Sequence, residues 1–97
     1  MILDEQVVKI FKALGHPIRL KIIKSLLNET KCVCELNNNI EFSQSNLSQH
    51  LKILKEAGIV KSTKVGTNIH YTIACEAIAE LLDVTENIAT DYFKNLK

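Results

Sequence analysis

The hydrophobic positions of this chain follow two different periods, and the change between them divides the sequence. Over most of residues 3–56, apolar residues recur every three or four positions, which is the spacing of amphipathic helices. After Gly58 they alternate with polar residues, as in half-buried strands, and beyond residue 75 the helical spacing returns. The pattern predicts a mainly α-helical fold that contains one small β-hairpin.

The first part of the chain predicts two consecutive helices. Residues 3–14 carry a helical apolar stripe that Gly15 ends. His16-Pro17 restarts the chain, with proline at a favoured first-turn position. The second helix runs to about residue 28 and is the more strongly apolar of the two.

A helix-turn-helix is expected next. A short helix over residues 35–40 leads through a turn to Ser43, which can cap a further helix. Gly58 stands where the C-terminus of that helix needs a left-handed residue. Two short helices joined by a tight turn form this motif. The inner side of the second helix carries Leu47, Leu51 and Leu54.

The outer side of this second helix shows hydroxyls, an amide and a lysine in place of dense charge. Such side chains suit the reading of base edges in the major groove of DNA. An ordinary amphipathic surface helix would carry the same pattern. The residues concerned are Ser45, Ser48, Gln49 and Lys52.

The alternating segment predicts a hairpin that acts as the wing of a winged helix. Two strands, over residues 60–64 and 69–73, flank the turn signal at residues 65–68. Lys61 and Lys64 lie on the first strand and can reach DNA phosphate.

The last helix, over residues 76–96, has an apolar stripe too long for a chain of 97 residues to cover comfortably. We therefore expect it to pack, with residues 3–14, on a second copy of the chain in a homodimer. Packing within one chain is the alternative.

Composition indicates one globular domain spanning residues 1–97, since 46% of the residues are hydrophobic. No apolar run reaches the length of a membrane span and no secretory leader is evident, so we expect no membrane partner and a cytoplasmic location. The net charge is only +1, but residues 43–74 hold four lysines against one acidic residue. Residues 75–97 hold five acidic residues against two lysines. Nucleic-acid contact confined to one face fits this distribution.

An enzyme is not expected. The chain has three glycines and no phosphate-binding loop, and no nucleophile is placed beside a histidine and a carboxylate. A thiol-disulfide catalyst would separate two cysteines by two residues, whereas Cys32 and Cys34 are separated by one. Besides a DNA-binding protein and an enzyme, a module that binds only other proteins is the third functional class considered.

Three segments together resemble the ArsR/SmtB family of metal- and thiol-responsive repressors. Residues 13–26 read ALGHPIRLKIIKSL, residues 32–36 read CVCEL, and residues 43–60 read SQSNLSQHLKILKEAGIV. Each is similar to a motif of that family: its opening helices, its thiol sensor and its recognition helix. The resemblance covers about residues 8–82, and it implies a winged helix-turn-helix fold.

The resemblance also implies a function for the polar positions of residues 43–60. Gln44, Ser45, Ser48 and Gln49 would meet bases, beside the cap Ser43, and His50 and Lys52 would lie near the DNA backbone. The family is dimeric through its first and last helices. A twofold dimer would read an inverted-repeat operator in double-stranded DNA.

The cysteine pair predicts a soft-ligand site. Residues i and i+2 point about 200° apart on a helix, so both thiols can bind one ion only where the backbone is extended or just entering a helix. Cys32 and Cys34 lie at such an entry. Thiolates suit As(III), Sb(III), Cd(II), Pb(II) or Zn(II). The alternative is that both cysteines are small hydrophobes in the core.

A third ligand is harder to place. The arsenic-type members of the family often carry a third thiol where this chain has Asn37. If residues 32–34 pair with residues 72–75 of the second wing strand, Cys75 becomes a third ligand, or a disulfide partner in a repressor that senses oxidants or persulfides. Plain packing of Cys75 is equally open. The family's histidine and carboxylate site on the last helix is absent, and we expect His16 to cap a helix and His70 to lie on the outer face of the wing.

Overall fold

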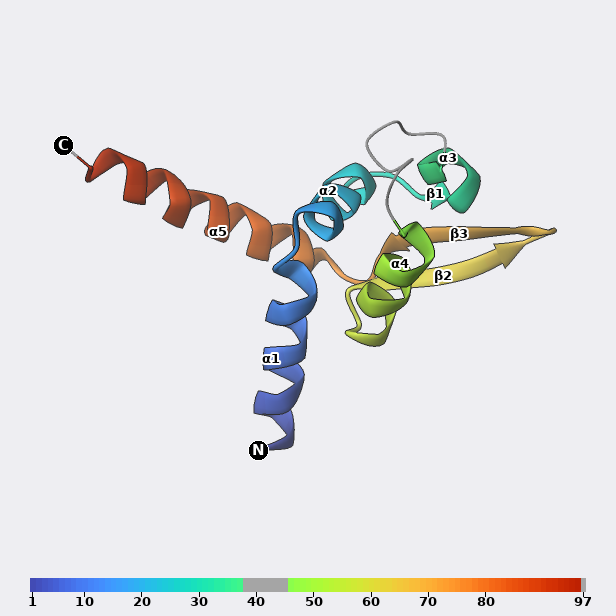
Figure 1. Cartoon of the computed structure of the whole chain (residues 1–97), viewed down its shortest axis with the longest axis horizontal. Helices are drawn as coiled ribbons and strands as arrows, with labels where there is room; N and C mark the ends of the chain where they lie inside the picture. Colours follow the sequence, from blue (N-terminus) through green and yellow to red (C-terminus); the bar gives the residue numbers. More distant parts are fainter. Residues whose placement is uncertain (38–45, 97) are drawn as a thin grey trace.

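The computed structural model describes residues 1–37 and 46–96 (Figure 1). Within them the helices are α1 (Ile2–Leu14), α2 (Pro17–Leu26), α3 (Val33–Asn37), α4 (Leu47–Glu56) and α5 (Glu76–Lys94). The strands are β1 (Lys31–Cys32), β2 (Val60–Val65) and β3 (Asn68–Ile73). This order confirms the winged helix-turn-helix, with α3 and α4 as the helix pair and the β2–β3 hairpin as the wing.

The first two helices follow the sequence pattern closely. The side chain of His16 caps α2, because its Nδ1 accepts a hydrogen bond from the backbone N–H of Ile18 at 3.1 Å. The predicted capping role is therefore confirmed. Helix α2 ends at Leu26, two residues before the expected end, where the Leu27 N–H donates to the Lys24 carbonyl in a tighter i→i+3 turn.

The helix pair begins at different residues from those expected. Helix α3 starts at Val33, so Cys34 lies inside it, and the turn expected between residue 40 and Ser43 lies outside the described residues. Helix α4 starts at Leu47, and its N-cap is Asn46, not Ser43. The Asn46 side chain accepts a hydrogen bond from the backbone N–H of Gln49 at 3.4 Å, and asparagine is among the strongest N-capping residues.

Helix α4 ends as predicted. Gly58 follows its C-cap with a φ of +82°, a left-handed conformation that glycine adopts without steric cost. One residue before it, the carbonyl of Ala57 accepts a hydrogen bond from the Gln6 side chain at 2.9 Å. This bond joins α1 to the end of α4.

The three strands form one antiparallel sheet in the order β1-β3-β2. The segment before the helix pair thus lies beside the second wing strand, as expected. The register differs from the expected one, because Lys31 pairs with Tyr71 and Cys32 pairs with His70. Residues 72–75 are therefore not opposite the cysteines.

One hydrophobic cluster lies where α2, α3, α4, the end of α1, the base of the wing and the start of α5 meet. Its most completely buried side chains are Ile22, Ile23, Leu26, Leu36, Leu51, Leu54 and Ile59. Helices α1 and α5 extend away from this cluster in different directions, and the wing extends to the opposite side from α5 (Figure 1). The molecule is consequently elongated, with extents of 52 × 36 × 23 Å. Among the described residues, no helix is both long enough and apolar enough to cross a membrane.

Candidate DNA-binding surface and thiol site

Helix α4 presents one apolar and one polar side. Leu47, Leu51 and Leu54 are buried against the core. Ser48 and Gln49 are exposed on the first turn, and Lys52 is exposed one turn further on. The described part of this helix therefore has free amide, hydroxyl and ammonium groups in the positions expected for contact with DNA. The other three candidates, Ser43, Gln44 and Ser45, lie outside the described residues.

Asn46 is a polar residue of this surface that the sequence pattern did not single out. It is exposed at the N-terminus of α4, directly before the buried Leu47. Its side-chain oxygen caps the helix, while its amide group remains available. The signal that could have found it is an asparagine immediately before the first apolar position of a helix.

His50 faces α2. It is half-buried, and its ring lies 4.6 Å from the ring of His16, centroid to centroid. Burial, followed by the positive charges of His16 and Arg19, lowers the pKa of His50 below its usual value. Within the described residues, His50 Nδ1 and Arg19 Nε are buried without a hydrogen-bond partner. In this structure His50 is thus part of the contact between α2 and α4, although the sequence suggested a position near the DNA backbone.

The wing lysines are both exposed, but they lie on opposite faces of β2. Lys61 pairs with Thr72 and Lys64 pairs with Ile69, and positions three residues apart on a strand point to opposite faces. Lys64 lies near the tip of the hairpin, next to the turn at Gly66, and Lys61 lies near its base.

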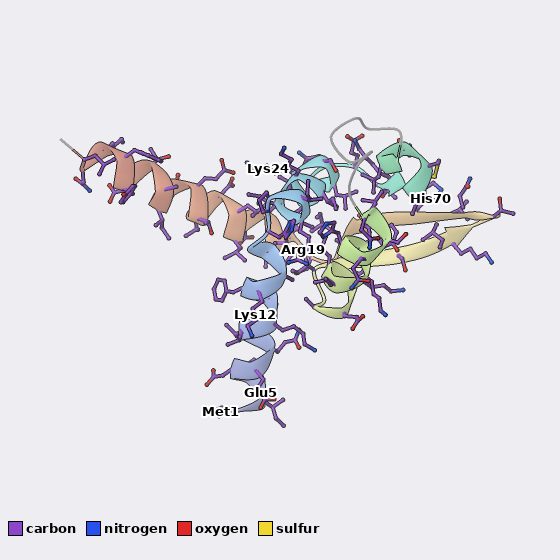
Figure 2. The ribbon with its side chains drawn as sticks, viewed as in Figure 1. Met1, Glu5, Lys12, Arg19, Lys24 and His70 are labelled. Atoms are coloured by element: carbon purple, nitrogen blue, oxygen red, sulfur yellow. A yellow bond between two sulfur atoms is a disulfide. The ribbon has the colours of Figure 1, made fainter. Side chains whose placement is uncertain are left out.

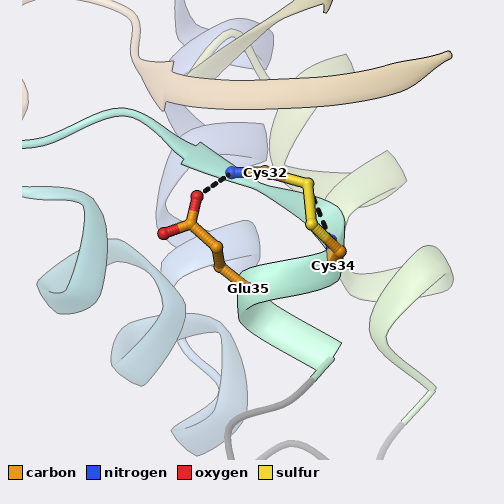
Figure 3. Close-up of a disulfide and its surroundings, with 3 residues drawn as sticks. All are labelled: Cys32, Cys34 and Glu35. Atoms are coloured by element: carbon orange, nitrogen blue, oxygen red, sulfur yellow. Dashed lines mark hydrogen bonds between the residues drawn. A yellow bond between two sulfur atoms is a disulfide. The ribbon is translucent and has the colours of Figure 1, made fainter.

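The two cysteines of the CVC motif lie side by side at the start of α3 (Figure 3). Their sulfur atoms are joined in a disulfide, and their Cα atoms are 5.2 Å apart. Cys32 is the last residue of β1 and is 4% exposed, whereas Cys34 is exposed in the first turn of α3. The extended backbone at Cys32 lets two thiols at spacing i, i+2 face each other, as the sequence argument required.

Hydrogen bonds hold this turn in place. The Glu35 carboxylate accepts a bond from the backbone N–H of Cys32 at 3.0 Å, and the backbone N–H of Cys34 donates to Cys32 Sγ at 3.1 Å. Figure 3 shows the Glu35 carboxylate on the side of Cys32 away from the sulfur atoms. Glu35 therefore orients the backbone, a role that the sequence pattern did not reveal.

Cys75 does not join this pair. It is a free, exposed cysteine at the N-cap of α5. Because Cys32 is opposite His70, Cys75 is five residues further along, which corresponds to about 16 Å at 3.3 Å per strand residue. In this register Cys75 does not lie opposite the pair, and the disulfide joins Cys32 to Cys34 and not to Cys75. Among the described residues, no three His, Cys, Asp or Glu side chains already converge on one point.

The sequence is similar to known regulators. Residues 16–62 match the model of the family described as "Bacterial regulatory protein, arsR family". An uncharacterized HTH-type transcriptional regulator of Methanocaldococcus jannaschii is 40% identical over 85 residues, which span 87% of this chain and 96% of that protein. A cadmium resistance transcriptional regulatory protein CadC homolog of Staphylococcus aureus is 40% identical, over 79% of this chain and 64% of its own. A transcriptional repressor SmtB homolog of Synechocystis is 35% identical, and the match covers 79% of this chain and 58% of that protein.

Solved structures are similar over almost the whole chain. The crystal structure of Rv0081 from Mycobacterium tuberculosis superposes with a TM-score of 0.85 at 34% identity, covering 96% of this chain and 94% of that one. The homodimeric winged helix-turn-helix DNA-binding domain of Mb0332 from Mycobacterium bovis, a possible ArsR-family regulator, gives a TM-score of 0.84 at 28% identity. That match covers 96% of this chain and 86% of the other.

Proposed function

The chain belongs to the arsR family of bacterial regulatory proteins, and we propose that it is a transcriptional repressor whose operator binding is released when Cys32 and Cys34 bind a metal or metalloid ion. One observation carries the proposal: the two sulfur atoms lie together at the entry of α3, the first helix of the DNA-reading pair. The relatives are named as transcriptional regulators, and not as enzymes.

We propose a homodimer that binds an inverted repeat in double-stranded DNA. The exposed polar side of α4 supports base contact by Ser48 and Gln49, with Gln44 and Ser45 as further candidates and Ser43 beside them. Lys52, Lys61 and Lys64 would contact phosphate. The exposed apolar side chains of α1 and α5 support pairing of two copies, and the similar Mb0332 domain is itself homodimeric. DNA as the partner supports a cytoplasmic location.

The inducer is proposed to be an ion with high affinity for sulfur. Two thiolates 5.2 Å apart at their Cα atoms fit one such ion, and the candidates are As(III), Sb(III), Cd(II), Pb(II) and Zn(II). The CadC homolog among the relatives is named for cadmium resistance, which supports a soft divalent ion. Cys75 is not part of the proposed site.

Release would follow from the position of the thiols. Binding of one ion by Cys32 and Cys34 would change the angle at which α3 leaves β1, and α3 packs beside the wing strand β3. A change at this point would move the recognition helices of the two protomers out of register with successive grooves. A coupling of about 1–3 kcal/mol, or about 5- to 150-fold in operator affinity, is enough to switch a promoter.

The experiment measures operator affinity of the reduced protein, with and without Cd²⁺ and with and without arsenite, in excess phosphine reductant. The parent should lose affinity by about 5- to 150-fold on addition of the inducing ion. Cys32→Ser and Cys34→Ser should bind the operator normally and ignore the ion. Cys75→Ser is the matched control and should respond like the parent, because Cys75 is a free, exposed cysteine that is not part of the pair. If the two serine variants at positions 32 and 34 respond like the parent, the thiol pair is not the sensor.

A further inference from the structure

We propose that His70, on the wing strand β3, is the third ligand of the thiol site, so that Cys32, Cys34 and His70 together bind a divalent cation such as Cd²⁺ or Zn²⁺. The inference rests on the proposed function, since it completes the same site. His70 takes the place of Cys75, which is too remote to be the third ligand. A histidine ligand also favours some of the proposed inducing ions over others.

The register of the sheet brings His70 to the cysteine pair. Cys32 in β1 is the partner of His70 in β3, in an antiparallel pair. Residues directly opposite each other in such a pair carry their side chains on the same face, with Cβ atoms about 4.5–5.5 Å apart. Metal–sulfur and metal–nitrogen bonds of about 2.3 and 2.0 Å can span this separation. Figure 2 shows His70 beside the start of α3, where the disulfide lies.

The two faces of β3 have different surroundings. Tyr71 and Ile73 pack against the hydrophobic core, so His70 lies on the opposite face. Cys32 shares this face with His70, and although it is only 4% exposed it is not a member of the core cluster. A buried thiol and a half-buried imidazole thus share one face of the sheet.

Space for an ion is present next to the thiols. An open surface pocket of about 330 Å³ lies between the entry of α3 and the beginning of β3. Reduction of the disulfide would free both sulfur atoms to turn toward an ion, and rotation of the His70 side chain would bring a ring nitrogen to it. The pocket is lined by Cys32, Val33, Cys34, Thr67, Asn68 and Ile69, the last of which directly precedes His70.

The donor set decides which ions fit. Two thiolates and one imidazole are a common set for zinc and for cations of similar chemistry, whose fourth position water can occupy. Trigonal binding of As(III) would need a third thiolate, and Cys75 is about 16 Å away by the spacing of strand residues. The site should therefore prefer divalent cations to arsenite.

This arrangement would also connect two DNA-contacting elements. Cys32 and Cys34 belong to the entry of α3, and His70 belongs to the wing that carries Lys61 and Lys64. An ion held by all three residues would fix the wing relative to the helix pair. That constraint gives ion binding a direct way to change how the two elements fit DNA.

The test titrates reduced full-length protein with Cd²⁺ and follows the sulfur-to-cadmium charge-transfer absorption. His70→Gln should weaken Cd²⁺ binding at least about tenfold, since loss of even an outer partner of a metal ligand costs about 10- to 100-fold. Thr72→Ala, two residues along on the same face of β3, is the matched control and should bind Cd²⁺ like the parent. In the parent, the ¹⁵N resonances of the His70 ring should shift when Cd²⁺ is added.

The outcomes separate the two levels of the proposal. Unchanged Cd²⁺ affinity of His70→Gln, together with unmoved His70 ring resonances in the parent, would rule out His70 while leaving the thiol sensor intact. Weaker Cd²⁺ binding in Cys32→Ser and Cys34→Ser, with His70→Gln binding Cd²⁺ as tightly as the parent, would support a site of two thiols alone. If neither serine variant alters Cd²⁺ binding, the proposed function itself fails. The NMR measurement of the His70 ring is made on the parent protein, so its result does not depend on whether a variant folds.

Discussion

At the scale of single residues, His16 and His50 form a ring contact between the start of α2 and the recognition helix α4. His16 caps α2 through its Nδ1, and its ring packs on the ring of His50. Arg19 adds a positive charge near this pair, and its Nε is buried without a partner among the described residues. A protonated His50 would add positive charge to a partly buried site that already holds a guanidinium, and this is why burial and these neighbours lower the pKa of His50.

The lowered pKa predicts that the folded protein loses stability as the pH falls. The unfolded chain binds a proton at His50 near pH 6.5, while the folded chain resists protonation until the pH is lower. Stability is therefore complete above about pH 6.5 and falls as the pH decreases through the folded-state pKa. Urea unfolding at about pH 7.5 and about pH 5 should show a smaller difference between the two midpoints for His50→Gln than for the parent. Carboxylates contribute equally to both proteins, so identical pH dependence of the two would contradict this assignment.

At the scale of elements, α4 and the wing should contribute differently to DNA binding. Gln49 is exposed on the first turn of α4, where its amide can make paired hydrogen bonds to a base edge. Gln49→Ala should cost about 1–3 kcal/mol on the operator and relax the preference for one base. Fluorescence anisotropy on the operator and on random DNA would measure both effects. Equal losses on the two DNAs would remove Gln49 from base reading.

Lys64 is the residue to compare with Gln49, because we expect Lys64 to contact DNA phosphate and not a base. Lys64→Ala should weaken binding to operator and random DNA alike and reduce the slope of affinity against salt by about one unit. Lys61 lies on the other face of β2, so the two lysines need not have equal effects. A change in base preference for Lys64→Ala would conflict with a phosphate contact.

At the scale of the whole molecule, the apolar surfaces of α1 and α5 are too exposed for a chain that acts alone. Phe11 is 60% exposed on α1, and Ile88 and Phe93 are 66% and 68% exposed on α5. Both helices extend away from the core, so their apolar stripes have little within the described chain to cover them (Figure 1). A second copy of the chain would bury both stripes at once.

Phe11→Glu and Ile88→Glu should therefore convert the dimer into a monomer. A charge introduced into an apolar interface leaves that charge without a partner when the two copies associate. Sedimentation velocity at tens of micromolar, about the range where such dimers form, would show the change. Val65→Glu is the matched control, because Val65 is 55% exposed but lies at the wing tip. A monomeric parent would contradict the proposed dimer.

The amino-acid sequence by itself determined the order and type of most elements of this protein, although not where α3 and α4 begin, because each element depends mainly on residues close together in the chain. Leu47, Leu51 and Leu54 recur with the period of a helix and are buried, and the left-handed conformation of Gly58 ends that helix. The spacing of Cys32 and Cys34 likewise required an extended entry, and β1 provides it.

Only the tertiary structure decided which distant residues meet. Apolar alternation on β3 shows which residues share a face, but β1 has two residues and carries no pattern that selects its partner positions. Only in the folded chain is the register of β1 against β3 fixed, and it brings His70 opposite Cys32 and leaves Cys75 away from it. The same holds for His50, because its contact with His16 depends on how α2 crosses α4 and not on the period of either helix.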